Sequence, residues 1–317
     1  MTNKNIDVFV ISFNRLTYLK SIINWLEKAG FENIHIIDNN STYPPLLEYL
    51  KFSKHDVCIM DKNYGHLVVW ACGKFNDILN NKYYIVSDCD ILPVNECTSN
   101  VTEYFLSILN KYRHLTKVGF ALKVDDLPDQ YLFKDVVVDW EKKFWTKKID
   151  KGLFDAPIDT TFALYRPGIF PNNKYWYKSI RTDYPYVARH LPWYSDSSKI
   201  SEEDQFYLKE INESSSNWVL TDVNMLQKRN NELRTELMKV YKSRKWIVLQ
   251  IIYKFFNLFL PLEKIHTKIG KKLNLFIVNS DAKLLLKNNI EISSELNSIR
   301  NSMGWRVLKK LSNIVRK

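Results

Sequence analysis

Two aspartates that follow an apolar run are the residues best suited to chemistry in this sequence. In YYIVSDCD, Asp88 and Asp90 come directly after the apolar stretch 83–87. Carboxylates two residues apart at a strand end point to the same side, and two like charges held close together repel each other unless a cation lies near them. Mn²⁺ or Mg²⁺ is held by one or two carboxylates and keeps its other positions for phosphate oxygens and water. The pair therefore predicts a metal site, which in a transferase would stabilise the charge on a leaving diphosphate.

The first 125 residues contain the alternation of elements that places such a pair. Short apolar runs predict strands at 8–13, 35–38, 57–60, 83–87 and 118–123, and amphipathic stretches predict helices at 16–28 and 67–79. In the first of these helices, four apolar side chains share one face: Leu19, Ile22, Ile23 and Leu26. This order predicts an α/β fold with an open, mostly parallel sheet and flanking helices.

Ligands of such sheets bind beyond the carboxyl ends of the strands. Polar residues follow four of the predicted strands at Asn14, 38–41, 61–63 and 88–90. Residues 1–125 are therefore predicted to be a nucleotide-binding half. Residues 126–222 are irregular and rich in aromatic residues, which favours an acceptor-binding half, although the rings can equally be core.

A reaction in which a hydroxyl attacks a substrate needs a general base near that hydroxyl. Candidates are Glu203, Asp204 and Asp159. Ser201 to Asp204 also has the pattern of a capping box that opens a helix, so a structural role for the two acids at 203 and 204 stays open. Asp159, Asp125 and Asp126 are also candidates for binding sugar hydroxyls. Arg189 can neutralise a diphosphate, which suits a bidentate guanidinium.

Residues 223–317 carry most of the positive charge. They hold 20 lysine and arginine residues against 6 acidic ones, within a total net charge of +11. Leu226, Leu233, Leu237 and Val240 have a spacing typical of a short coiled coil or a docked helix, which is compatible with a homo-oligomer.

The same tail contains an internal repeat. Residues 236–249 and 295–308 share Glu-Leu, an aliphatic residue, Ser and Trp-x-Val-Leu at the same offsets. A basic amphipathic segment with a tryptophan suits the headgroup layer of an anionic membrane. Packing of the same helices on the catalytic domain is the alternative. Nucleic acid is not expected as a partner, because phosphate binding does not need so much aliphatic surface.

The chain shows neither a signal-peptide core nor an apolar stretch of membrane-spanning length. Its four cysteines, Cys58, Cys72, Cys89 and Cys97, follow no paired spacing. Together these features predict a cytoplasmic protein that associates peripherally with the inner face of the cell membrane.

Four motifs resemble those of glycosyltransferases of the GT-A fold, closest to bacterial family 2-like members. They are FVISFNR, IIDNNS, DKNYG and SDCD, within residues 6–125. The resemblance implies transfer of a sugar, a hexose or N-acetylhexosamine, from a nucleotide-diphosphate sugar, with UDP as the expected nucleotide, to a glycan or lipid-linked acceptor in surface polysaccharide synthesis. In the IIDNNS motif, Asp38-Asn39-Asn40-Ser41 stands where many members have a second acid and a glycine.

The resemblance also implies roles for individual residues. The nucleoside would lie near Ser12, Asn14 and Asp38, closed off by Asp61, Asn63 and Gly65. Asp90 would bind the metal directly, and Asp88 would reach it through water or contact the ribose. His190, late in the domain, would be a third metal ligand, although a loop histidine with an ordinary hydrogen bond is equally compatible. The acids at 203 and 204 would supply the base.

Two other functions stay open. A sugar nucleotidyltransferase would need a glycine-rich phosphate loop after the first strand, and Ser12-Phe-Asn-Arg-Leu-Thr contains no glycine. A non-catalytic scaffold that binds a nucleotide sugar would keep the fold and the tail.

Overall fold

The protein is described from a computed structural model. The structure describes residues 2–131, 133–171, 174–196, 199–210, 223–243, 288 and 291–292. The chain forms two compact units, Met1–Val219 and Leu220–Lys317.

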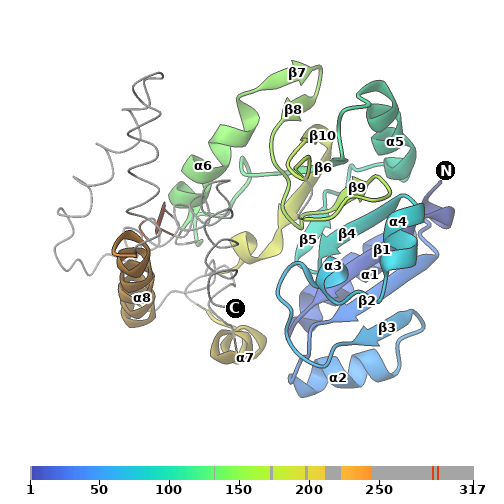
Figure 1. Ribbon diagram of the computed structural model, residues 1–317. Coiled ribbons are helices and arrows are strands. Elements are labelled where there is room, and N and C mark those ends of the chain that lie inside the picture. The colour runs from blue at the N-terminus through green and yellow to red at the C-terminus, as the bar shows by residue number, and fades with distance from the viewer. Residues whose placement is uncertain are drawn as a thin grey trace, which may run out of the picture. The chain divides into compact units, whose positions relative to one another are not determined.

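The first unit is built on one sheet that runs from β3 at one edge to β7 at the other (Figure 1). Its strand order is β3-β2-β1-β4-β9-β6-β10-β8-β7, and β5 pairs with β10. The strands are β1 Asp7–Ser12, β2 Asn33–Asp38, β3 Asp56–Ile59, β4 Tyr84–Asp88, β5 Ile91–Pro93, β6 Lys117–Leu122, β7 Lys148–Asp150, β8 Leu153–Asp155, β9 Ala163–Tyr165 and β10 Ser179–His190. The predicted α/β class is confirmed.

Strand direction departs from a uniformly parallel sheet in the second half of the unit. β3, β2, β1 and β4 are parallel, as are β6 and β10. β9 lies between β4 and β6 and is antiparallel to both, while β7 and β8 form an antiparallel edge. Residues 126–219 thus supply four strands to the same sheet, so the predicted change to irregular structure after residue 125 is wrong in this respect.

Helices and short 3₁₀ turns flank the sheet. They are α1 Leu16–Lys28, α2 Pro44–Lys51, α3 Val68–Ala71, α4 Asn76–Asn81, α5 Val101–Lys111, α6 Lys134–Lys142 and α7 Glu202–Glu210, with η1 Asn3–Asn5, η2 Lys143–Trp145 and η3 Leu191–Tyr194. α1 has the predicted bounds and buries the predicted apolar face. The single helix predicted over 67–79 is instead two helices, because Gly73 adopts a φ of 72° that an α-helix does not accept.

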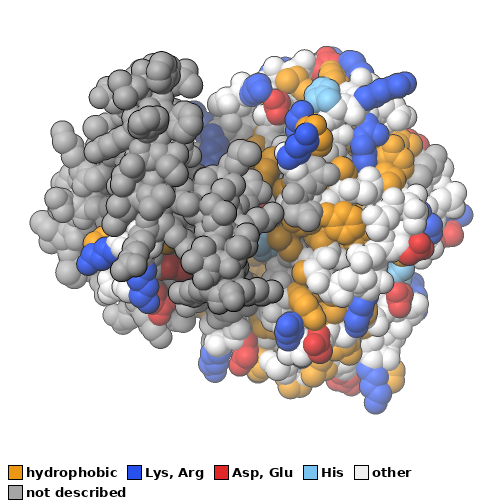
Figure 2. All heavy atoms as spheres, in the orientation of Figure 1, with side chains coloured by type: hydrophobic (Ala, Val, Ile, Leu, Met, Phe, Trp, Pro, Cys, Tyr) orange, Lys and Arg blue, Asp and Glu red, His pale blue; other side chains and the backbone are white. Residues whose placement is uncertain are grey.

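The centre of the sheet is buried on both faces. Every residue of β1 and of β6 is buried, as expected for strands covered by helices on each side. On the face shown in Figure 2, lysine, arginine and acidic side chains of the first unit are interspersed. The basic character of the sequence therefore does not gather into one patch on that face.

The second unit contains α8 Val223–Tyr241. Leu233, Leu237 and Val240 form a small buried cluster with Tyr241 and Ile292 packed against it, which accounts for three of the four predicted apolar positions; the side chain of Leu226 lies outside the described residues. Most of the internal repeat, including Trp246 and Trp305, also lies outside them. Within the described ranges, no helix has both the length and the apolar character needed to cross a lipid bilayer.

Candidate functional site

The carboxyl ends of β1 and β2 bring together three of the predicted nucleoside contacts. Ser12 and Asp38 are register partners, and the turn after β1 places Asn14 at a φ of 51°. All three are buried, yet Ser12 Oγ, Asn14 Nδ2 and Asp38 Oδ1 have no hydrogen-bond partner among the described residues. Buried polar atoms without partners are costly, and the described residues leave the hydrogen-bonding capacity of these three atoms unused.

The remaining atoms of the same residues hold the loop in place. Asp38 Oδ2 accepts a hydrogen bond from the Ser41 backbone N–H at 2.9 Å. Asn14 Oδ1 accepts from the backbone N–H groups of Thr42 and Tyr43 at 2.8 and 2.9 Å, just before α2 begins. Burial raises the pKa of Asp38, although its bonds to Ser41 oppose the shift. The fold thus holds the Asp38 side chain through Oδ2 and the Asn14 side chain through Oδ1.

The loop after β3 is tied to this cluster by Asn39, a residue that was not singled out as a contact. Its amide donates to the Gly65 carbonyl at 3.0 Å and accepts from the Tyr64 N–H at 2.8 Å. Asn63 in turn accepts from the Gly65 N–H, and Asp61 accepts from the Tyr64 hydroxyl at 3.0 Å. The structure therefore links Asn63 and Gly65 to the β2 end, while the Asp61 carboxylate lies on the exposed rim.

Asp88, at the end of β4, is held by the segment before β9. Its N–H donates to the Thr160 carbonyl at 2.9 Å, and the Thr160 hydroxyl donates to Asp88 Oδ2. Burial raises the pKa of Asp88 well above its ordinary value, and the nearby Asp90 adds to the shift. The chain turns at Cys89 and Asp90 before β5, so strand alternation does not set their relative direction.

The raised pKa of Asp88 predicts a stability effect with a definite sign. The folded state keeps its proton to a higher pH than the unfolded state, so stability falls as pH rises from about 4 through the folded pKa. Asp88→Asn removes this penalty. We expect the melting temperature in EDTA at pH 7 to rise by about 2–6 °C, and the gain to shrink towards pH 4. Asp129→Asn, at a carboxylate that is 95% exposed, is the control; a fall in the Asp88→Asn melting temperature would contradict the assignment.

Asp90 meets His190 although the two residues are 100 positions apart in the sequence. β5 pairs with the end of β10 so that His190 is the register partner of Ile91, and the Leu191 N–H donates to the Asp90 carbonyl at 2.8 Å. His190 Nε2 then lies 3.4 Å from Asp90 Oδ2. Burial lowers the pKa of His190, with Asp90 opposing the shift; the shift favours the neutral imidazole, the form that has a lone pair for a metal.

The separation of these two side chains is near that of neighbouring ligands on one octahedral divalent ion. Bonds of about 2.1 Å place neighbouring ligand atoms about 3 Å apart, close to the observed separation, and carboxylate oxygen with imidazole nitrogen is a donor set that Mn²⁺ accepts. In the part of the chain that the structure describes, no group of three or more His, Cys, Asp or Glu side chains is arranged to hold a metal. The protein would thus supply two direct ligands and leave the other positions to phosphate and water.

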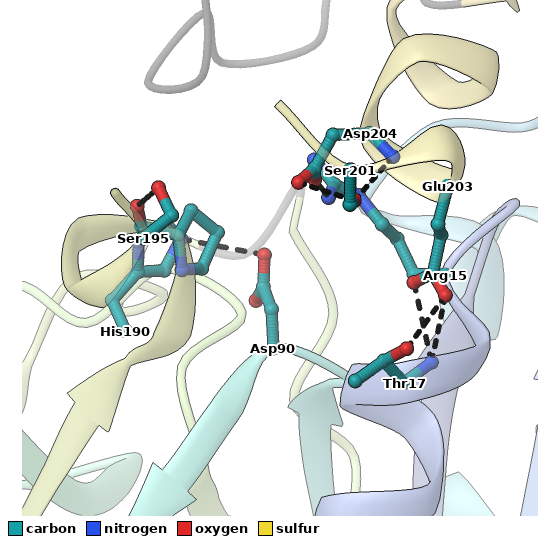
Figure 3. Close-up of polar contacts among 9 residues, drawn as sticks. Arg15, Thr17, Asp90, His190, Ser195, Ser201, Glu203 and Asp204 are labelled. Atoms are coloured by element: carbon teal, nitrogen blue, oxygen red, sulfur yellow. Dashed lines mark hydrogen bonds and ion pairs between the residues drawn. The ribbon is translucent and has the colours of Figure 1, made fainter. Parts of the chain in front are cut away.

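Asp90 points into the space between His190 on one side and α1 with α7 on the other (Figure 3). On the α7 side, Arg15 forms a buried ion pair with Asp204, and Glu203 accepts hydrogen bonds from the Thr17 N–H and hydroxyl at 3.1 and 2.8 Å. The Asp204 N–H donates to Ser201 Oγ at 3.0 Å, which is one of the two bonds of the predicted capping box; the Asp204 carboxylate instead accepts from the Ser201 hydroxyl and pairs with Arg15. Both acids are therefore engaged in contacts that dock α7 on the start of α1.

The other predicted residues lie around this centre with different partners. Arg189 donates to Asp126 Oδ2 at 2.6 Å, and Tyr194 donates to the second oxygen of that carboxylate, so Arg189 is already paired. Asp125 is exposed and bonded to Lys123. Asp159 is 78% exposed, lies 3.9 Å from His66, and precedes the Thr160 that holds Asp88.

Arg15 and Thr160 are the site residues that sequence patterns did not indicate. Arg15 lies in the FVISFNR motif, but an arginine in a basic chain carries little signal by itself. Thr160 acts on Asp88 from 72 positions away. The placement of β9 between β4 and β6 is what brings it there.

Comparisons with known proteins add no family to this geometry. A scan against models of protein families finds no match, and a search of curated proteins finds no significant relative.

Proposed function

We propose that the chain is a metal-dependent glycosyltransferase of the GT-A type. It would move a sugar from a nucleotide-diphosphate sugar, with UDP as the expected nucleotide, to a glycan or lipid-linked acceptor in surface polysaccharide synthesis. One observation carries the proposal: a carboxylate and an imidazole meet at 3.4 Å beside the carboxyl edge of the sheet. The same edge holds the unpartnered polar atoms of Ser12, Asn14 and Asp38.

In this proposal the donor spans both clusters. The nucleoside takes the unpartnered atoms at the ends of β1 and β2, with Asn63 and Gly65 closing the loop beside them. Asp90 and His190 hold Mn²⁺ or Mg²⁺, which stabilises negative charge on the diphosphate as it leaves. Burial raises the pKa of Asp88. Asp88 would reach the same metal through water or contact a ribose hydroxyl.

The acceptor side is assigned to Asp159. A general base takes the proton of the acceptor hydroxyl. The oxygen of that hydroxyl then forms a bond to the sugar as the bond between the sugar and the diphosphate breaks. Glu203 and Asp204 are buried and bonded to Thr17, Ser201 and Arg15, which supports a structural role for both. The carboxylate of Asp159 is exposed and lies on the segment that holds Asp88.

Donor hydrolysis tests the proposal without knowledge of the acceptor. The purified protein is incubated with a panel of nucleotide-diphosphate sugars, with Mn²⁺ or with EDTA, and release of the nucleoside diphosphate is followed. We expect slow release from one nucleotide class, with Mn²⁺ only. Absence of release from every donor, together with absence of binding, would overturn the proposal.

A scaffold that binds a nucleotide sugar without turning it over is the second candidate. The engagement of Glu203 and Asp204 in structural contacts favours it. Metal-dependent binding of a nucleoside diphosphate without hydrolysis or transfer, over a panel of donors and acceptors, would identify the scaffold.

The basic tail supports a further part of the proposal, peripheral attachment to an anionic membrane. A variant that ends at residue 222 keeps the whole first compact unit, which ends at Val219. We expect the full chain, but not this variant, to sediment with vesicles that contain phosphatidylglycerol, and raised salt to release it. Circular dichroism checks that the variant is folded. If the folded variant sediments like the full chain, the tail is not the membrane contact.

A further inference from the structure

Arg15 is an arginine buried beside the proposed metal site. It lies in the turn between β1 and α1 and is 4% exposed. Its guanidinium is 3.8 Å from the centre of the Tyr207 ring and 5.1 Å from that of Tyr18, and Nη1 bonds to Asp204. Rings and carboxylate together fix the plane of the guanidinium.

Much of the donor capacity of this guanidinium remains available. It carries five N–H groups in a planar fork, and among the described residues a hydrogen bond is made from Nη1, to Asp204. A planar fork of this kind suits the paired oxygens of a phosphate. The ion pair with Asp204 therefore orients the Arg15 guanidinium without using all of its N–H donors.

The charge of Arg15 is within electrostatic reach of both proposed metal ligands. Burial lowers the pKa of Arg15, but Tyr207, Asp204, Tyr18 and Asp90 together raise it above its ordinary value. Arg15 also lowers the pKa of His190, after the larger effect of burial. Figure 3 shows Asp90 between His190 and the Arg15 side of the site.

We propose that Arg15 binds the diphosphate of the donor opposite the metal, and that Asp204 on α7 positions it. This inference rests on the proposed function. It names Arg15 as the group that distinguishes a nucleoside diphosphate from a monophosphate at that site. The diphosphate lies between two cationic groups: the ion held by Asp90 and His190, and the guanidinium. Docking of α7 is then coupled to donor binding through the Arg15–Asp204 pair.

A purely structural role for Arg15 is the competing explanation, and the chain contains a matched control for it. Arg181 and Glu141 form a second buried ion pair at 2.8 Å, with side chains 5% and 4% exposed. Arg181 also lies over an aromatic ring, 4.0 Å from the centre of Phe144. Arg181→Met thus removes an equally buried arginine that does not lie beside Asp90.

The experiment measures Kd for UDP and for UMP with Mn²⁺ by calorimetry, using the full chain, in the wild type, Arg15→Met, Arg15→Lys and Arg181→Met. If another base binds better, its diphosphate and monophosphate replace UDP and UMP. We expect the wild type to prefer the diphosphate and Arg15→Met to lose about 10- to 100-fold of that preference. Arg15→Lys loses a smaller part, because a point charge replaces the fork. Arg181→Met keeps the preference.

Each other outcome has one meaning. An unchanged preference in Arg15→Met, or an equal loss in Arg181→Met, overturns the role of Arg15. If Arg15→Met does not fold, an unchanged preference in Arg15→Lys overturns it instead. A wild type that binds both nucleotides equally also overturns the inference, whereas a wild type that binds no nucleotide overturns the proposed function itself.

Discussion

Asp90→Asn is expected to lower metal-dependent donor hydrolysis by about a thousandfold or more. The substitution keeps the size of the side chain but removes the negative charge that lies 3.4 Å from His190. A hard divalent ion is then left with imidazole as its one strong protein ligand, and stabilisation of the departing diphosphate is lost. The rate of nucleoside diphosphate release, titrated with Mn²⁺, measures the effect.

Asp155→Asn is the matched control for Asp90→Asn. Asp155 is on β8 and is the register partner of Ile180, near the start of β10 and at the other end of that strand from His190. Its half-exposed carboxylate pairs with Lys147. We expect this variant to keep wild-type rates and the wild-type dependence on Mn²⁺. Retention of both properties by Asp90→Asn would remove Asp90 from the metal site.

Gly119→Ala is expected to destabilise the first unit by about 3 kcal/mol or more. A Cβ at this position of β6 would lie 2.4 Å from the Phe162 carbonyl oxygen and 2.7 Å from Ala163 Cβ. The nearest of these obstacles is backbone, so rotation of a side chain does not relieve the clash. The free energy of unfolding, measured with a chemical denaturant, gives the effect.

Gly30→Ala separates this clash from the general cost of losing a glycine. Gly30 has a φ of 82° and open space where its Cβ would lie, so the expected cost is about 1–2 kcal/mol. If Gly119→Ala costs no more than Gly30→Ala, β9 does not approach β6 as the structure shows. The position of the Thr160 segment on Asp88 would then also be in question.

The sequence predicted elements well where a local pattern was strong. α1 has both its bounds and its buried face as predicted, because amphipathic periodicity over 13 residues leaves one way to bury the apolar stripe. β1, β2 and β4 likewise follow from short apolar runs that need burial on both faces. β9 was not predicted: three residues, Ala163–Tyr165, carry no period, and tertiary pairing with β4 and β6 defines the strand.

The candidate site was predictable in its residue types but not in its pairings. A strand-end Asp-x-Asp pattern indicated Asp88 and Asp90, yet no local signal separates their partners, Thr160 for one and His190 for the other. The helix start capped by Ser201 was visible in the sequence. That its acids contact α1, and that Asp204 pairs with Arg15, depends on contacts 186 and 189 positions apart.

The most direct test of the central claim is the melting temperature of the full chain with UDP, GDP, ADP and CMP, each with Mn²⁺ and with EDTA. Ligands that bind the folded state raise the melting temperature. We predict that one nucleotide raises it with Mn²⁺ and not with EDTA, and that Asp90→Asn abolishes the shift. No shift with any nucleotide, or an equal shift in EDTA, would contradict a metal-dependent nucleotide site at Asp90 and His190.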